Sequence, residues 1–92
     1  MREKSIENKI KAYLKSKGAY YVKYHGNQFS QVGVADILAC YKGRFIAIEV
    51  KNETGKPSPL QLVNQKMVID AGGISIIARS VEEVAKVIDN II

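Results

Sequence analysis

The sequence predicts a single α/β domain over residues 1–92, in which helices flank a central mixed sheet in the order α-β-β-β-α-β-α. Segments with apolar residues at helical spacing alternate with short β-branched and aromatic runs. Glycines or polar clusters separate these segments, and two of the short runs flank a two-residue turn. The length provides for one modest hydrophobic core and not for two.

The first helix is expected over residues 2–17, where apolar side chains follow the i, i+4, i+7, i+8 spacing of one buried stripe. These side chains are Ile6, Ile10, Tyr13 and Leu14. Gly18 suits the left-handed position that follows a helix end. The aromatic and β-branched segment AYYVKY, 19–24, is typical of a strand, and the polar segment HGNQFSQVG, 25–33, is typical of a loop.

The segments VADILACY, 34–41, and RFIAIEVK, 44–51, flank the dipeptide KG and predict a β-hairpin. A polar cluster, 52–59, then leads to a helix that runs to about Ala71 and ends at a glycine pair. The segment ISIIA, 74–78, is apolar enough for a short strand that is covered on both faces. A capping box of Ser80 and Glu83 opens the last helix.

Charged residues interrupt the apolar pattern of the hairpin at one end. A two-residue KG turn would pair Tyr41 with Arg44 and place Asp36 directly opposite Glu49. Lys51 lies two residues beyond Glu49 and therefore projects from the same face. The rest of that face is apolar and is expected to be buried: Leu38, Cys40, Phe45 and Ala47.

Two carboxylates about 5 Å apart repel by roughly 3 kcal/mol at an effective dielectric constant near 20, so a divalent cation is the natural compensation. Mg²⁺ takes carboxylate oxygens and is completed by water and substrate phosphate. Lys51 beside such an ion fits an anionic scissile phosphate, and the trio therefore indicates metal-assisted phosphodiester hydrolysis. The alternative interpretation is three strand-end charges, with Lys51 paired to both carboxylates across the ladder.

Composition narrows the class of protein. The net charge of +5 favours an acidic partner such as nucleic acid or an anionic membrane, although many soluble proteins without such a partner carry a similar charge. One histidine and one cysteine exclude a structural zinc site, and Cys40 is interpreted as a small core residue in a reducing compartment. The charged N-terminus resembles no signal peptide, and no apolar run is long enough to span a membrane, so an intracellular protein is expected.

The segment GVADIL, 33–38, followed by EVK thirteen residues after Asp36, resembles the PD-(D/E)XK nuclease superfamily. The longer run from Gly33 to Gly73 resembles the VRR-NUC family, whose pattern has a G-x-P-D strand, an E-x-K strand, an "SP-Q" helix start and a glycine pair. The resemblance extends from Glu7 to about Ile77 and implies a restriction-endonuclease-like fold. Two departures are Ala35, where the family has proline, and FSQV, where the family has basic residues.

The resemblance implies a set of catalytic residues: Asp36, Glu49, Lys51, Gln61, Gln65 and Glu7. Asp36, Glu49 and the carbonyl of Val50 would bind Mg²⁺ or Mn²⁺, and Lys51 would be the catalytic lysine. Gln61 matches the family's glutamine after SP, and Gln65 shares its helix face one turn further on. Surface roles for Glu7 and the glutamines stay open, as do DNA contacts by the loop and strand residues Lys23, His25, Gln28, Ser30 and Gln31.

The chain resembles stand-alone, minimal VRR-NUC members, which implies a structure-selective endodeoxyribonuclease that acts as a homodimer on branched DNA, including four-way (Holliday) junctions. It also implies a cytoplasmic location in a prokaryotic or phage-infected cell and no membrane partner. The last helix, which ends VIDNII, is one candidate for the dimer contact or is simply core. Alternatives are a DNA-binding module that does not cleave and an interaction domain whose charges are structural.

Overall fold

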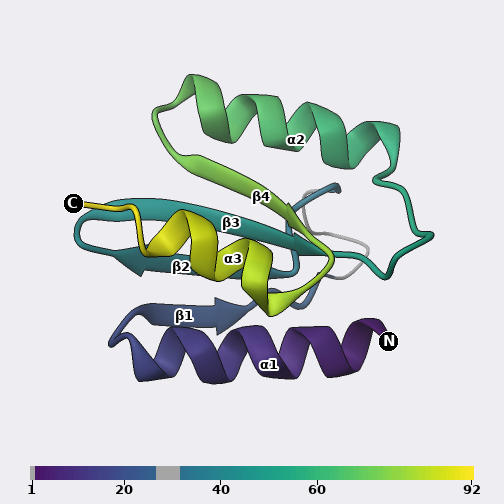
Figure 1. The fold of residues 1–92 in the computed structure, drawn as a ribbon. Coiled ribbons are helices and arrows are strands. Elements are labelled where there is room, and N and C mark those ends of the chain that lie inside the picture. Colours follow the sequence, from purple (N-terminus) through teal and green to yellow (C-terminus); the bar gives the residue numbers. More distant parts are fainter. Residues whose placement is uncertain (1, 27–31) are drawn as a thin grey trace.

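The computed structural model describes residues 2–26 and 32–92 and confirms the predicted order of helices and strands (Figure 1). The elements are α1 (Glu3–Ser16), β1 (Tyr20–Lys23), β2 (Ile37–Tyr41), β3 (Arg44–Val50), α2 (Pro59–Asp70), β4 (Ile74–Ala78) and α3 (Val81–Ile88). Gln28, Ser30 and Gln31 lie outside the described residues. Within the described part of the chain, no helix has the length and apolar character needed to cross a membrane.

The four strands form one mixed sheet in the order β1-β2-β3-β4. The first three strands are antiparallel, whereas β4 runs parallel to β3 because α2 carries the chain back across the sheet. The predicted hairpin register is confirmed, with Tyr41 opposite Arg44 and Ile37 opposite Ile48. Lys42 and Gly43 both have positive φ angles, of 51° and 78°, as a tight two-residue hairpin turn requires.

One face of the sheet carries the hydrophobic core, because α1 and α3 lie side by side against it (Figure 1). The helices contribute Ile6, Ile10, Leu14, Val84 and Ile88, all of which are buried. The sheet contributes the alternate residues of its two central strands, Ile37, Ala39, Ile46, Ile48 and Val50, and β4 adds Ile76 and Ala78. The apolar stripe of the last helix therefore belongs to the hydrophobic core, which was one of the two roles predicted for it, the other being a dimer contact.

The opposite face is covered less than the sequence predicted. Ala47 is buried on it, but Phe45 is 46% exposed and Cys40 is exposed, so the interpretation of Cys40 as a core residue is wrong. The reason is the position of α2, which lies beside β4 and leaves the β1–β2 side of this face open. No residue of α2 is buried, and its apolar side chains Leu62, Met67 and Ile69 are exposed.

Gly33 fixes the approach of the segment before β2 to the first turn of α2. Its φ angle is +87°, and a Cβ atom at this position would lie 2.4 Å from the carbonyl oxygen of Leu60. Only glycine accepts both the left-handed backbone and this close contact. Gly33 therefore holds the start of α2 close to the start of β2, where Asp36 lies.

We expect Gly33→Ala to destabilise the protein more than Gly18→Ala. Gly18 has a similar φ of +77°, but a Cβ atom there would meet nothing within 4 Å, so its cost is the backbone strain of roughly 1–2 kcal/mol. Gly33→Ala adds a displacement of the α2 backbone to the same strain. Urea unfolding of the two variants measures the difference, and equal losses would contradict the proposed contact with α2.

Candidate active site

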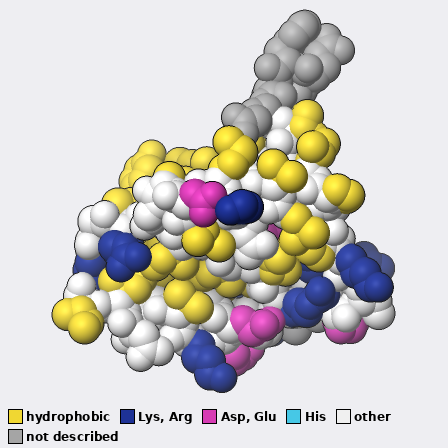
Figure 2. Space-filling model, turned by 90° about the horizontal axis from the view of Figure 1, so that it is seen from above, with side chains coloured by type: hydrophobic (Ala, Val, Ile, Leu, Met, Phe, Trp, Pro, Cys, Tyr) yellow, Lys and Arg dark blue, Asp and Glu magenta, His cyan; other side chains and the backbone are white. Residues whose placement is uncertain are grey.

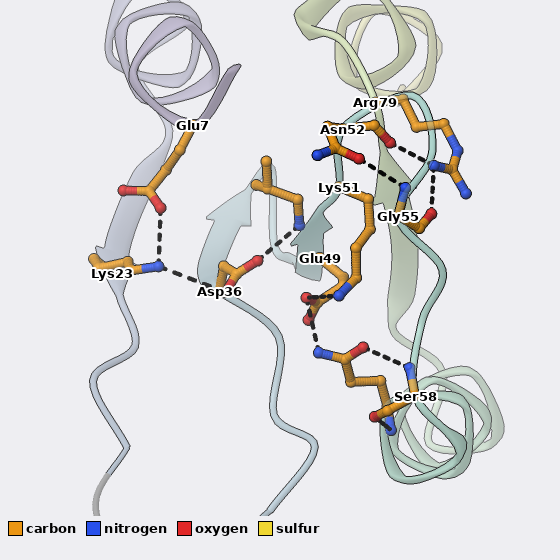
Figure 3. A network of polar contacts seen from close by, with 11 residues as sticks. Glu7, Lys23, Asp36, Glu49, Lys51, Asn52, Gly55, Ser58 and Arg79 are labelled. Carbon is orange, nitrogen blue, oxygen red and sulfur yellow. Dashed lines mark hydrogen bonds and ion pairs between the residues drawn. The ribbon is translucent and has the colours of Figure 1, made fainter. Parts of the chain in front are cut away.

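The charged end of the β2–β3 hairpin brings Asp36 and Glu49 together. Continuing the hairpin register by one residue places Asp36 opposite Glu49, as predicted. The N–H of Val50 donates to Oδ2 of Asp36 at 2.8 Å (Figure 3). The carbonyl of Asp36 accepts from the N–H of Tyr24 at 2.8 Å. Asp36 is thus held by backbone groups of both neighbouring strands.

Glu49 is the more buried of the two carboxylates, with 7% of its surface exposed. Its Oε2 accepts from Nε2 of Gln61 at 2.9 Å and lies 3.6 Å from Nζ of Lys51. Its Oε1 is buried and accepts no hydrogen bond from any residue that the structure describes. A carboxylate oxygen in this condition is costly in the absence of a cation or another donor.

Burial is the main reason that the pKa of Glu49 rises from 4.5 to about 7, and the adjacent charge of Asp36 adds to the rise. Lys51 opposes both effects without cancelling them. Near neutral pH the metal-free pair therefore carries less than two full negative charges. A strongly raised pKa of a buried carboxyl group beside a second carboxylate is typical of functional sites.

Gln61 has two roles at the start of α2. Its backbone N–H donates to Oγ of Ser58, and its side-chain Oε1 accepts from the N–H of Ser58, which completes a capping box. Because Oε1 is used in the cap, the amide nitrogen is directed to Glu49. Gln61 therefore contacts Glu49, whereas the side chain of Gln65 is half-buried and makes no hydrogen bond with any described residue.

Glu7 lies near this site but contacts lysines and not the carboxylate pair. Nζ of Lys23 is 2.9 Å from Oε1 of Glu7 and 3.5 Å from Oδ1 of Asp36, so one ammonium group bridges the two acids (Figure 3). Burial alone would raise the pKa of Glu7, but hydrogen bonds and charges from Lys23 and Lys11 outweigh it and lower the pKa to about 2. The sequence suggested Lys23 only as a phosphate contact and gave no indication of this bridge.

A second group that sequence reasoning missed is Arg79, at the end of β4. Its Nη1 donates to the carbonyl oxygens of Asn52 and Gly55, each at 2.6 Å. Oδ1 of Asn52 in turn accepts from the N–H of Gly55 at 2.7 Å. These bonds fix the segment between Lys51 and α2, and a lone arginine after a strand carries no motif that would reveal them.

The donor set fits a hard divalent cation. Asp36 and Glu49 offer carboxylate oxygens, and Oε1 of Glu49 accepts no hydrogen bond from a described residue and is therefore available to a cation. Among the described residues, no group of three or more His, Cys, Asp or Glu side chains could hold a metal ion, so the candidate ligand set is the carboxylate pair of Asp36 and Glu49. The N–H of Val50 donates a hydrogen bond to Asp36. Binding of a metal ion by the carbonyl oxygen of Val50 stays a prediction.

We expect the stability of the metal-free protein to fall as the pH rises between about 4.5 and 7. A carboxyl group whose folded pKa is raised contributes stability below its unfolded pKa, and that contribution is lost as the pH passes through the folded value. The shift from 4.5 to about 7 corresponds to on the order of 3 kcal/mol.

Glu49→Gln should remove this pH dependence and make the protein more stable than wild type at pH 8 in EDTA. Urea unfolding at a series of pH values, compared between the two proteins, measures the effect. Parallel pH profiles would show that Glu49 titrates with an ordinary pKa.

Comparison with solved structures identifies the fold. A solved chain described as "VRR_NUC domain" superposes with a TM-score of 0.80 and 25% sequence identity, over 98% of this chain and 97% of that chain. No protein-family model and no curated protein matches the sequence. The structural match and the G-x-x-D and E-x-K strands now seen side by side agree with one another. The chain therefore has the fold of a VRR-NUC domain, as its motifs predicted, and this is the architecture of a nuclease-like family.

Proposed function

We propose that the protein is a divalent-metal-dependent endodeoxyribonuclease that hydrolyses phosphodiester bonds in branched DNA such as four-way junctions. The observation that carries this proposal is the pair of Asp36 and Glu49, with one buried Glu49 oxygen unpartnered and Lys51 adjacent. The VRR-NUC fold supports the same reaction class. The preference for branched DNA comes from the resemblance to minimal family members.

Asp36 and Glu49 would hold Mg²⁺ or Mn²⁺, which supplies Lewis-acid polarisation of a phosphate oxygen and lowers the pKa of a bound water. Gln61 fixes the orientation of Glu49 through Oε2 and leaves Oε1 available. The ammonium of Lys51 lies beside Glu49 and is placed to donate to a phosphate oxygen as its charge grows. Arg79 keeps the segment after Lys51 in place, so that the lysine projects from a fixed backbone.

The net charge of +5 supports a polyanionic substrate. Several lysines of α1 are exposed and are available to the backbone of a nucleic acid: Lys4, Lys9 and Lys15. Contacts by His25, which is exposed, and by the residues outside the described ranges stay predictions. The cytoplasmic location expected from the sequence also stays a prediction.

The resemblance implies a homodimer, and we propose that α2 forms the contact between the two copies. Three of its apolar residues, Leu60, Val63 and Met67, are roughly half exposed and share one side of the helix. Leu62 and Ile69 are exposed to a similar extent but lie on the opposite side of the helix. Figure 2 looks down on α2 and shows hydrophobic side chains over much of this face. The charged residues of α2, Lys66 and Asp70, pair with each other at 3.0 Å, so two copies of the helix can meet without charge repulsion.

An exposed apolar patch of this kind marks an interaction surface. A second copy of the chain is the proposed occupant, because a surface with no net charge is poorly suited to DNA and well suited to itself. A two-fold dimer formed through α2 would carry two sites. Two sites on one particle suit paired cuts in a branched substrate.

Lys51→Met should lower the rate of DNA cleavage about 100-fold or more, because it removes a donor to the developing charge. The test measures cleavage of duplex, flap and four-way DNA with Mg²⁺ or Mn²⁺, and EDTA should stop it. Lys42→Met is the matched control, since Lys42 is exposed at the opposite end of the same hairpin. If the wild-type protein cleaved none of these substrates, the proposed nuclease activity would be refuted. DNA binding that survives in EDTA would then favour a DNA-binding module that does not cleave.

Met67→Lys should convert the protein from dimer to monomer, because it places a charge on the apolar side of α2, where Met67 is 55% exposed. Light scattering on the wild type and the variant measures the mass in solution. Ile92→Lys, a change at another exposed apolar residue, should leave the dimer intact. A wild-type monomer, free or on DNA, would remove the paired-cut model and leave the cleavage proposal standing.

A further inference from the structure

A single ammonium group lies on the Asp36 side of the carboxylate pair. Nζ of Lys23 contacts Oε1 of Glu7 at 2.9 Å and Oδ1 of Asp36 at 3.5 Å. The other oxygen of Asp36 accepts from the N–H of Val50, so Lys23 holds the oxygen that remains. Figure 3 shows Lys23 extending between the two acids from β1.

Glu7 is already neutralised by lysines. Its carboxylate is buried and has Lys23 on Oε1, with Lys11 at 3.2 Å and Lys4 at 3.5 Å from Oε2. Three positive charges around one carboxylate leave it little attraction for a divalent ion. Glu7 as it stands is an anchor for Lys23 and not a free metal ligand.

The contacts of Lys23 resemble those of a bound cation. A divalent ion that bridged the same two oxygens would lie about 2.0–2.6 Å from each, so the two acids, now 2.9 Å and 3.5 Å from the ammonium nitrogen, would have to move closer together to bind it. The ammonium supplies one positive charge at this position and presents its remaining protons to the site. It also repels any metal ion that approaches the same oxygens.

We propose that the ammonium of Lys23 occupies the position of a second cation beside Asp36, so that each chain binds one divalent ion, between Asp36 and Glu49. Glu7 is then a positioning residue that holds Lys23 in place. The proposal rests on the metal-dependent activity proposed above, because it takes Asp36 and Glu49 as the ligands of the first ion. In this proposal the partner of Glu7 is the ammonium group of Lys23 and not a metal ion.

Counting bound Mn²⁺ tests this directly, without DNA and without cleavage. Titration of the protein with Mn²⁺, followed by electron paramagnetic resonance of the free ion, should give one ion per chain for wild type. Lys23→Met leaves the carboxylates of Glu7 and Asp36 with no ammonium between them and should raise the count to two. The double variant Lys23→Met/Glu7→Gln removes a ligand of the second ion and should return the count to one.

Lys4→Met is the matched control, because Lys4 also pairs with Glu7 but its contact is with the oxygen that faces away from Lys23. This variant should keep one ion per chain, and so should Lys23→Arg, which preserves the charge. Circular dichroism establishes that each variant is folded. The wild-type count needs no variant and stands even if Lys23→Met does not fold.

Two ions bound by wild type, or one ion bound by folded Lys23→Met, would overturn the role of Lys23 and leave the metal-dependent nuclease intact. Two ions bound by the double variant would show that Glu7 has no part in the second position and would overturn its positioning role. No ion bound by wild type would overturn the metal site itself. The failure of this inference is therefore distinguishable from the failure of the proposed function.

Discussion

The register between β2 and β3 is the constraint on which the rest of the site depends. Because side chains alternate between the faces of a sheet, a slip of one residue would send Glu49 into the core and Ile48 to the surface. The tight turn at Lys42 and Gly43 sets the register at one end, and the buried isoleucines of the central strands hold it along the ladder. The hydrophobic core therefore determines the distance between two carboxylates that contribute nothing to it.

The site is built outwards from this pair by single polar contacts from different elements. β1 contributes Lys23, α2 contributes Gln61, and the end of β4 contributes Arg79. Each contact joins the β2–β3 hairpin to a part of the chain that is distant in sequence. The arrangement places ammonium groups on both sides of two carboxylates, and the cost of burying Glu49 is offset only in part by its protein partners.

Much of this could be predicted from sequence because it depends on local patterns. The order of elements follows from periodicity and breakers, and the opposition of Asp36 and Glu49 follows from the length of one turn. The burial of the second sheet face could not be predicted in this way, because it depends on where α2 lies across the strands. Cys40 is exposed for that reason, although its pattern is that of a core residue.

The same distinction holds for the site residues. Gln61 could be placed by its motif, whereas Gln65 does not reach Glu49, since one further helical turn carries it about 5.4 Å along the axis. The position of Glu7 followed from the family pattern, but its contact with Lys23 depends on how α1 lies against β1. Arg79 acts through backbone carbonyls, which any sequence supplies, so no pattern of side chains reveals it.

The capping box of Ser58 and Gln61 links the folding of the first turn of α2 to the position of the Glu49 side chain. One side chain both begins α2 and restrains Glu49, so closure of the first helical turn and orientation of the Glu49 carboxylate are coupled. α2 buries no side chain of its own, and its first turn is correspondingly easy to open. By thermodynamic reciprocity, an ion that favours the restrained Glu49 must also favour the closed first turn. Fraying at this helix end and the affinity of any ion that binds through Glu49 would therefore be linked by one coupling free energy.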